Sequence, residues 1–446
     1  MMNEKIFKAY DVRGIYPSEI NEETVHLIAK SYAQWLKPKK VILGRDVRTS
    51  SEALFEQAKR GLSEMGVDVV DIGVVSSEMF LFAVAHYGFD GGISITASHD
   101  PAEYNGMKIV REDSIPVSIE AGLAEIKAIA TKGEFTEPKN NGKFEKLEIL
   151  DDYIEKVLSF VDESKVKPMK IVFNTSNGTG GKVVSIVVEK LGLDLVKQNF
   201  EEDGRFPKGA PNPLLPENQE ETQSLVRSSQ AILGVALDGD GDRCFFFDEN
   251  GEFVDSCYAN AIIFEIILKK NPGAKIVFDT SVVWAIRDSI EKNGGVPLEN
   301  KVGYVFLKDR MRKEDAFFAG EHSGHYFSKD FYFCDSGIIP ALLLIEHLSV
   351  TGLRLSEIVN PMREKYPISG EIRFKVANPE KIFSAIETKY TEGDINHMDG
   401  VTVEFPDWRL NVRPSNTEPL VRLNIEAKTK ELVDEKVKEL SEIIEA

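Results

Sequence analysis

Three aspartates alternate with glycines in the run DGDGDR at positions 238–243, between the apolar segments 232–237 and 244–247. This spacing lets a tight loop fold the carboxylates of Asp238, Asp240 and Asp242 around one hard cation, because glycine relieves the steric limits on the backbone. An EF-hand calcium loop needs glycine at its sixth place, where this chain has Arg243. Three carboxylates leave Mg²⁺ room for phosphate oxygens and water. The run therefore predicts a magnesium site, and the alternative is an acidic turn exposed to solvent.

A serine that could carry a phosphoryl group lies in the run TASHDP at 96–101. The run follows residues 92–95, which are typical of a strand, and open parallel sheets bind ligands at the carboxyl ends of their strands. Ser98, beside His99 and with Lys108 a little further on, could be a nucleophile or a phosphoryl carrier. A turn or helix-cap serine explains the run equally well, so both interpretations stay open at this point.

The run GEHSGHYF at 320–327 combines a carboxylate, Glu321, with a hydroxyl, Ser323. Such a pair is suited to bonds with neighbouring sugar hydroxyls. His322 and His325 suggest a metal instead, but no third ligand follows nearby in the sequence. We expect a sugar contact, with a purely structural loop as the alternative.

The run RPSNTEP at 413–419, followed by Arg422, has the groups that hold a phosphate dianion. Hydroxyls, amides exposed by a turn and guanidinium groups all donate to phosphate, and arginine can do so with two parallel bonds. A plain hairpin turn is the alternative. In a chain with 54 Lys and Arg against 73 Asp and Glu, such local positive charge favours a phosphate site.

A strand, a turn and an amphipathic helix recur along the first three quarters of the chain, which predicts parallel βαβ units in three related α/β domains. The strand–helix pairs are 41–44 with 51–65, 170–173 with 182–191, and 275–278 with 282–292. The tail differs, because its expected strands surround two helices in an α+β module. These strands are 371–376, 401–405, 408–412 and 421–427, and the helices are 379–390 and 431–445.

The fold class predicted is therefore α/β, with three related α/β domains of mixed or parallel sheets and a C-terminal α+β domain. Polar and glycine-rich seams divide the chain. The predicted domains are 1–148 with the serine loop, 149–252 with the acidic loop, 253–366 with the sugar loop, and 367–446 with the phosphate loop.

Composition excludes several classes of protein. The 446 residues are 42% apolar with a net charge of −19, and no Lys/Arg-dense segment could follow a nucleic acid. The N-terminus lacks a signal-peptide pattern, and no window approaches the roughly 18 apolar residues of a membrane span. We expect a cytoplasmic protein with no nucleic-acid or membrane partner. Cys244, Cys257 and Cys334 have no metal or disulfide spacing and are expected to be buried.

Taken together, the four runs strongly resemble, in their order and intervals, the α-D-phosphohexomutases, particularly the phosphomannomutase/phosphoglucomutase branch. The resemblance covers essentially the whole chain and includes FKAYDVRG at 7–14 and GRDVR at 44–48. It implies four domains around one central cleft. The implied reaction is reversible phosphoryl transfer between C1 and C6 of a hexose phosphate, through a phosphoserine and a hexose 1,6-bisphosphate, with Mg²⁺.

The resemblance also implies roles for individual residues. Ser98 would carry the phosphoryl group and join Asp238, Asp240 and Asp242 around Mg²⁺. Glu321 and Ser323 would contact sugar hydroxyls. Arg13, Arg243 and Lys108 would line the reacting centre, with His99 and Lys108 as candidate acid and base. The phosphate that is not transferred would be held by Arg413, Ser415, Asn416 and Thr417, with Arg422 as a weaker candidate.

Three positions depart from the family pattern. Asp100 stands where asparagine is common, Tyr304 where many bacterial members have histidine, and Ser281 where some dual-specificity members have lysine. These departures leave the general acid and base open. Because mannose and glucose differ at C2, a loop that contacts only the 3- and 4-hydroxyls predicts use of both sugars.

The alternatives are a phosphoglucosamine mutase, a catalytically silent sugar-phosphate-binding protein on the same fold, and a phosphatase. The run SNTEP resembles the neutral-hexose branch more than the glucosamine branch, which tends to carry SGTEP and GEQSGH. The sequence leaves the oligomeric state open.

Overall fold

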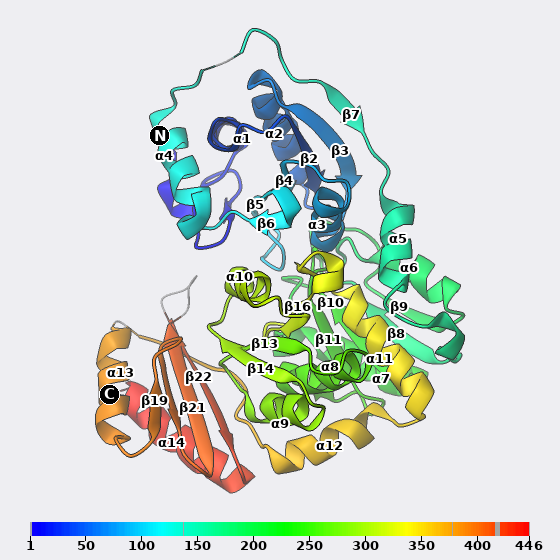
Figure 1. Ribbon diagram of the computed structural model, residues 1–446, viewed down its shortest axis with the longest axis vertical. Helices are drawn as coiled ribbons and strands as arrows, with labels where there is room; N and C mark the ends of the chain where they lie inside the picture. Colours follow the sequence, from blue (N-terminus) through cyan, green and yellow to red (C-terminus); the bar gives the residue numbers. More distant parts are fainter. Residues whose placement is uncertain (1, 137, 377, 415–419, 446) are drawn as a thin grey trace. The chain divides into compact units, whose positions relative to one another are not determined.

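The computed structural model describes residues 2–136, 138–376, 378–414 and 420–445 (Figure 1). The chain forms two compact units, which we describe separately. The first unit contains Met1–Glu252 and Asp330–Val350, and the second contains Phe253–Lys329 and Thr351–Ala446.

The first unit begins with a mixed sheet in the order β1-β5-β4-β2-β3-β7, with β6 beside β5. Strands β4, β2, β3 and β7 are parallel, whereas β5 is antiparallel to β4 and β1. The strands are β1 (Val12–Ile15), β2 (Lys40–Arg45), β3 (Asp68–Val74), β4 (Gly91–Ile95), β5 (Tyr104–Arg111), β6 (Ile115–Pro116) and β7 (Phe144–Lys146), and the helices are α1 (Glu22–Leu36), α2 (Ser51–Glu64), α3 (Ser77–His86) and α4 (Ala124–Lys132). Strand β4 is buried along its whole length, which explains its continuous run of small and apolar residues.

A second sheet of this unit contains strands in the order β11-β10-β8-β9. Its elements are β8 (Lys170–Asn174), β9 (Asp194–Gln198), β10 (Leu233–Leu237), β11 (Cys244–Phe247), α5 (Leu150–Leu158), α6 (Gly181–Lys190) and α7 (Glu220–Ser229). The short strand β12 (Phe253–Val254) already belongs to the second unit. Strands β8, β9 and β10 are parallel, and β11 returns antiparallel to β10. The acidic run therefore forms the turn between two fully buried strands. Residues 330–350 add β17 (Cys334–Asp335) and most of α11 (Ile338–Thr351).

In the first part of the second unit, strands pair in the order β14-β13-β15-β16. Its elements are β13 (Lys275–Asp279), β14 (Val296–Asn300), β15 (Phe318–Gly320), β16 (Tyr326–Ser328), α8 (Ser256–Lys270), α9 (Trp284–Lys292), α10 (Tyr304–Glu314) and α12 (Leu355–Lys365). Strand β13 is parallel to both neighbours, so the carboxyl ends of β13, β14 and β15 lie at one edge of the sheet.

The C-terminal sheet, in the order β18-β22-β21-β20-β19, is antiparallel throughout and belongs to the same unit. Its elements are β18 (Ile372–Lys375), β19 (Asp394–Asn396), β20 (Val401–Glu404), β21 (Trp408–Pro414), β22 (Leu420–Ala427), α13 (Pro379–Lys389) and α14 (Lys430–Glu445). Both helices pack on this sheet, and Ile386 and Leu440 share one apolar core with Leu410 and Leu423 (Figure 1).

The fold class expected from the sequence is confirmed. Three sheets containing parallel strands precede an antiparallel α+β module, and the predicted strand–helix pairs are all present. The three cysteines are buried, as expected. The segment after Ser98 differs from a strand-to-helix turn, because it leads into the antiparallel strand β5 and not into a helix. The helix-cap interpretation of Ser98 is therefore wrong.

Within the described ranges, no single helix is long and apolar enough to cross a membrane. The consecutive helices α11 and α12 reach that length and composition only as a bent pair. The cytoplasmic location stays a prediction.

Candidate active site

Ser98 lies just beyond the carboxyl end of β4, in the turn that leads to β5. Its φ angle is 50°, in the left-handed region that residues other than glycine rarely adopt. The Ser98 amide donates to Thr96 Oγ1 at 2.9 Å, and the residue is only 2% exposed. A buried serine in a strained conformation indicates a site that the surrounding structure holds in place.

The group that holds this turn is the buried guanidinium of Arg48. Strands β2 and β4 pair in parallel and end together at Arg45 and Ile95, so the residues that follow them meet at one edge of the sheet. Arg48 is held by Asp46 at 3.1 Å. It donates to the main-chain oxygens of Ser98 (2.9 Å), Asp100 (2.6 Å), Pro101 (2.6 Å) and Tyr104 (2.9 Å). No role was predicted for Arg48 from the sequence. An arginine inside a motif is nevertheless a candidate functional residue in a chain with a net negative charge.

The predicted cation ligands come together in the turn between β10 and β11. Ligand oxygens of Asp238, Asp240 and Asp242 all lie within 4.8 Å of one another. The three residues are at most 1% exposed. Gly241 has a φ of 75°, so a glycine is needed where the loop reverses. An acidic turn exposed to solvent is therefore excluded.

The serine turn and the acidic loop are in direct contact within the first unit. Ser98 Oγ donates to Asp238 Oδ2 at 3.1 Å. Lys108 extends from β5, and its Nζ lies 2.6 Å from Asp240 Oδ2 and 2.5 Å from Asp242 Oδ2. Ser77 also donates to Asp240. The structure thus brings together residues that are far apart in the sequence, such as Ser77 and Asp240, which are 163 positions apart.

The positive side chains around these three carboxylates do not fully neutralise their negative charge. Burial, and then the charges of Asp242 and Asp240, raise the pKa of Asp238 well above its usual range, although Arg243 and Lys108 act in the opposite direction. Burial alone would lower the pKa of Lys108, but Asp240 and Asp242 hold it raised. Asp240 Oδ1 is buried and has no hydrogen-bond partner among the described residues. This donor set fits a hard divalent cation, which would bind the remaining oxygens and offset the repulsion.

Arg13 and His99 flank the serine turn. Arg13 Nη2 lies 2.6 Å from Asp11 Oδ2, and Nη1 lies 3.1 Å from Asp100 Oδ2. Burial would lower the pKa of Arg13, but these two carboxylates raise it. Asp100, which stands where family members commonly have asparagine, therefore forms a second ion pair with Arg13. His99 Nδ1 lies 3.2 Å from Ser98 Oγ.

In the second unit, the loop between β15 and β16 is arranged around the carboxylate of Glu321. Its Oε1 accepts from the Gly303 amide at 2.6 Å, and its Oε2 accepts from Ser323 and lies 3.0 Å from His325 Nδ1. Gly324 has a φ of 89°, as this tight turn requires. Tyr304, which stands where many bacterial family members have histidine, lies beside this loop. Its ring centre is 5.9 Å from that of His325.

His322 belongs to the same loop and has several carboxylates around it. Its amide donates to Asp279 Oδ2 at 2.5 Å, and Nδ1 lies 3.7 Å from Asp255. Burial would lower the pKa of His322, but Asp255, Asp279 and Glu371 raise it. These carboxylates favour the protonated form of the His322 imidazole, which cannot bind a metal.

The predicted phosphate cradle includes two guanidinium groups on adjacent strands. Arg413 on β21 pairs directly with Arg422 on β22. Glu371 Oε2 accepts from Arg413 Nη2 at 3.0 Å and from Arg422 Nη1 at 3.4 Å. Burial alone would raise the pKa of Glu371, but the two arginines lower it. No motif in the sequence indicated a role for Glu371. The other predicted members of the cradle, Ser415, Asn416 and Thr417, lie outside the described residues.

The matches to known proteins extend over nearly the whole chain. The phosphoglucomutase/phosphomannomutase sequence models match alpha/beta/alpha domain I at residues 4–137, domain II at 151–251, domain III at 257–366 and the C-terminal domain at 371–443. A phosphomannomutase of Vibrio cholerae serotype O1 is 44% identical over 452 residues, covering 98% of both chains. A phosphomannomutase of Escherichia coli K12 is 41% identical over 431 residues, covering 95% of this chain and 94% of the relative.

Solved structures agree with this assignment. A phosphoglucomutase/phosphomannomutase family protein from Burkholderia thailandensis has a TM-score of 0.87 at 27% identity, covering 99% of this chain and 97% of that one. The phosphoglucomutase parafusin from Paramecium, at 18% identity and a TM-score of 0.79, shows the same fold. With all four domains matched in order, this chain belongs to the phosphoglucomutase/phosphomannomutase family.

Proposed function

We propose that the chain is a hexose-phosphate mutase that transfers a phosphoryl group between C1 and C6 of mannose and glucose phosphates. The observation that carries this proposal is the contact of the strained Ser98 with Asp238, at 3.1 Å, inside a buried site with Lys108. Membership of the family adds the class of reaction. Relatives named phosphomannomutase support mannose as one sugar, and relatives named phosphohexose mutases in Xanthomonas campestris support a broader range.

Each half-reaction exchanges one phosphorus–oxygen bond for another. In the first half, the substrate hydroxyl oxygen bonds to the phosphorus of phospho-Ser98, the bond from phosphorus to Oγ breaks, and the hydroxyl proton passes to a base. In the second half, the other phosphate of the hexose 1,6-bisphosphate returns to Ser98, and the freed sugar oxygen regains a proton. His99, at 3.2 Å from Ser98 Oγ, and Lys108 are the candidates for this proton transfer.

The cationic side chains of the first unit stabilise the charge that moves in these steps. Phosphorylation of Ser98 adds about −1.5 to −2 charges to the site. Arg13, Arg243 and Lys108 are positioned by carboxylates before the substrate arrives, so no reorganisation is needed during transfer. Mg²⁺ would be held by Asp238, Asp240, Asp242 and a phosphoserine oxygen, and it supplies further neutralisation of the phosphoryl oxygens.

The second unit would recognise the rest of the substrate. Glu321 and Ser323 have the carboxylate and hydroxyl oxygens to accept from sugar hydroxyls. Arg413 and Arg422, with Ser415, Asn416 and Thr417, would hold the phosphate that is not transferred. One cradle serves both halves of the reaction because the bisphosphate turns end for end between them.

We also propose the domain boundaries 1–148, 149–252, 253–366 and 367–446. They fall between β7 and α5, at the start of β12, and between α12 and β18. Cytoplasmic location and the use of hexose 1,6-bisphosphate as activator belong to the same proposal.

The test is an assay of the purified chain with Mg²⁺ and a trace of glucose 1,6-bisphosphate. Mannose 1-phosphate, glucose 1-phosphate and glucosamine 1-phosphate are offered, and formation of each 6-phosphate is measured. We expect conversion of the first two sugars, a loss of at least about 1,000-fold in Ser98→Ala, and full activity in the control Ser228→Ala, at a residue on α7 outside the site.

Other outcomes would identify the alternatives. A hundredfold preference for glucosamine 1-phosphate would make the chain a phosphoglucosamine mutase, and stoichiometric release of phosphate would make it a phosphatase. Conversion of none of the three sugars by protein with phosphate on Ser98 would favour a silent sugar-phosphate-binding protein.

A further inference from the structure

The first turn of α3 is attached to the acidic loop through Ser77. The Ser77 amide donates to the main-chain oxygen of Asp240 at 2.9 Å, and the Ser77 hydroxyl donates to the Oδ2 atom of the same aspartate. Both residues are 1% exposed. The backbone and the carboxylate of one loop residue are therefore held by a single serine, within the first unit.

Ser77 also holds the lysine that pairs with this carboxylate. Lys108 Nζ donates to Ser77 Oγ at 2.9 Å and lies 2.6 Å from Asp240 Oδ2. The hydroxyl, the ammonium group and the carboxylate oxygen are thus in mutual contact. Because Oδ2 accepts from both of the other groups, the side chains of the protein already satisfy this oxygen.

The second oxygen of the same carboxylate is in a different position. Asp240 Oδ1 is buried and has no hydrogen-bond partner among the described residues. A buried carboxylate oxygen without a donor is costly. Because ligand oxygens of Asp238, Asp240 and Asp242 lie within 4.8 Å of one another, a cation bound among them would satisfy Oδ1. The contacts of Oδ2 therefore leave Asp240 to bind a cation through Oδ1 alone.

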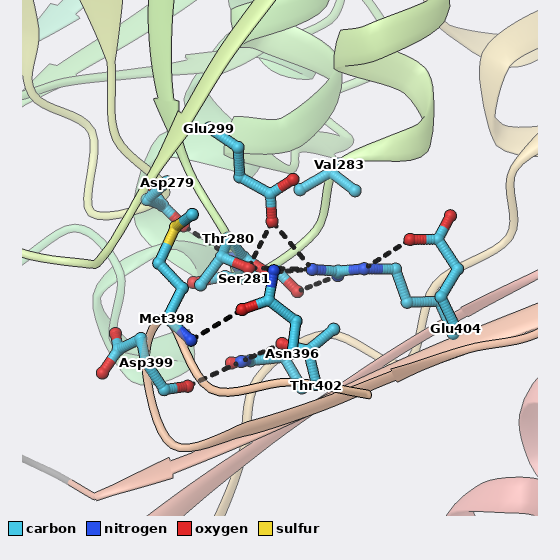
Figure 2. A network of polar contacts seen from close by, with 12 residues as sticks. Asp279, Thr280, Ser281, Val283, Glu299, Asn396, Met398, Asp399, Thr402 and Glu404 are labelled. Atoms are coloured by element: carbon cyan, nitrogen blue, oxygen red, sulfur yellow. Dashed lines mark hydrogen bonds and ion pairs between the residues drawn. The ribbon is translucent and has the colours of Figure 1, made fainter. Parts of the chain in front are cut away.

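A carboxylate of the second unit shows the contrasting arrangement. Glu299 of β14 is half-buried, and its Oε1 accepts from Thr280 Oγ1 (Figure 2). Its Oε2 accepts from Arg287 Nη2 at 2.6 Å. Both oxygens of Glu299 therefore have donors from the chain, so no bound ion is needed to satisfy them. Asp240 differs from Glu299 because only one of its two oxygens is satisfied in this way.

We propose that Ser77 is a positioning residue that selects Mg²⁺ over Ca²⁺ at the acidic loop, because it keeps Asp240 a ligand through one oxygen. This inference rests on the proposed magnesium site. Mg²⁺ demands a near-octahedral arrangement of ligands, whereas Ca²⁺ takes more oxygens and often binds both oxygens of one carboxylate. With Oδ2 held by Ser77 and Lys108, Asp240 has a single oxygen to offer, and this suits the smaller ion.

Removing the Ser77 hydroxyl changes the side chain of Asp240 and leaves the backbone of the loop attached. In Ser77→Ala the amide at position 77 still donates to the Asp240 main-chain oxygen. The Asp240 carboxylate loses one of its donors at Oδ2, and Lys108 loses an acceptor. Asp240 is then free to rotate and to offer both oxygens, which Ca²⁺ uses better than Mg²⁺. The two cations should therefore respond differently to this variant.

The experiment measures binding of Mg²⁺ alone and of Ca²⁺ alone to the full-length protein by isothermal titration calorimetry. The variants are Ser77→Ala and the matched control Ser76→Ala, with the phosphate content of Ser98 matched by mass spectrometry. Ser76 is also 1% exposed, but its hydroxyl accepts from the Met79 amide at 3.2 Å and caps α3. Loss of this cap destabilises the helix and leaves the hydroxyl that contacts Asp240 in place.

For Ser77→Ala we expect the Kd of Mg²⁺ to rise about 10-fold, as is common when a metal ligand loses its hydrogen-bond partner. The Kd of Ca²⁺ should stay within about threefold, so the preference for Mg²⁺ falls. In Ser76→Ala both Kd values should stay within about twofold of the wild type, although the protein unfolds at a lower temperature. If Ser77→Ala does not fold, Ser77→Cys carries the test, because a thiol has a similar shape but is a weak donor.

Equal weakening of both cations in Ser77→Ala, or an unchanged affinity for Mg²⁺, would overturn the inference. The same loss of preference in Ser76→Ala would also overturn it, because damage to α3 would then be the cause. A wild-type protein that binds neither cation would instead overturn the proposed magnesium site, so the two failures are distinguishable.

Discussion

Lys108 is the most informative residue at which to test whether the acidic loop is a cation site. Its ammonium lies 2.6 Å from Asp240 and 2.5 Å from Asp242, and both carboxylates are 1% exposed. Lys108→Met keeps the length of the side chain and removes its charge. Two buried carboxylates beside Asp238 then lose their nearest positive neighbour.

The expected magnitude follows from the burial of this cluster. Removing one partner of a buried ion pair destabilises a protein by about 3–5 kcal/mol, because the remaining charge is left uncompensated. For a unit of this size, 1 kcal/mol shifts Tm by about 2–4 °C. In EDTA we therefore expect Lys108→Met to unfold at least about 6 °C below the wild type. Mg²⁺ would supply the missing charge, and it should bind the variant more tightly than the wild type because Lys108 no longer competes for Asp240 and Asp242. A 100-fold difference in Kd would narrow the gap by about 2.7 kcal/mol.

The prediction is that the gap in stability between Lys108→Met and wild type is large in EDTA and shrinks to about 1 kcal/mol in Mg²⁺. Thermal unfolding is followed by proteolysis and mass spectrometry, so that each transition is assigned to one unit. Lys40→Met is the control, because Lys40 pairs with Glu145 at an exposed position and such pairs contribute at most about 1 kcal/mol.

The pH dependence gives a second check. The pKa of Asp238 is raised in the folded state, so protonation of this carboxyl stabilises folding at low pH, and that stabilisation is lost as pH rises through the folded pKa. In EDTA, the gap between Lys108→Met and wild type should narrow as pH falls. A gap that is the same in EDTA and in Mg²⁺ at every pH would refute the reasoning that the three carboxylates require a cation.

Two further predictions concern the first unit. Burial raises the pKa of Glu78 from 4.5 to about 7, so wild-type stability should fall by up to about 3 kcal/mol as pH rises through this range, and Glu78→Gln should remove that slope in Tm measured between pH 4 and pH 8. Arg48→Lys retains the charge but loses the planar group that reaches four main-chain oxygens, so phosphorylation of Ser98 by glucose 1,6-bisphosphate should slow by about 100-fold. Unchanged labelling of Ser98 in that variant would show that the turn does not depend on Arg48.

The parts of the site that were predicted from the sequence are those formed by short loops. The DGDGD run places three carboxylates within five residues, so their gathering can be predicted without any knowledge of the fold. The strand before Ser98 was also predicted, because β4 is a short run of small and apolar residues. Local spacing was enough to predict where these side chains would gather.

The residues that were missed act on partners far away in the sequence. Arg48 and Ser98 are 50 positions apart and meet only because β2 and β4 are parallel neighbours that end together. Glu371 meets Arg413 across 42 positions, and Ser77 meets Asp240 across 163. Their roles depend on strand pairing and on how two sheets pack, which periodicity within one segment does not encode.

Both units of this acidic chain hold their candidate phosphate-binding cations in the same way. Arg13 is held by Asp11 and Asp100, Lys108 by Asp240 and Asp242, and the pair Arg413 and Arg422 by Glu371. Each cation is ordered before a phosphate arrives, so binding does not have to immobilise a long flexible side chain. The same carboxylates also neutralise part of the positive charge of each cation, which limits the affinity for phosphate. Moderate affinity from preorganised side chains suits a mutase. Its bisphosphate intermediate must dissociate from both contacts, turn, and bind again in the opposite orientation.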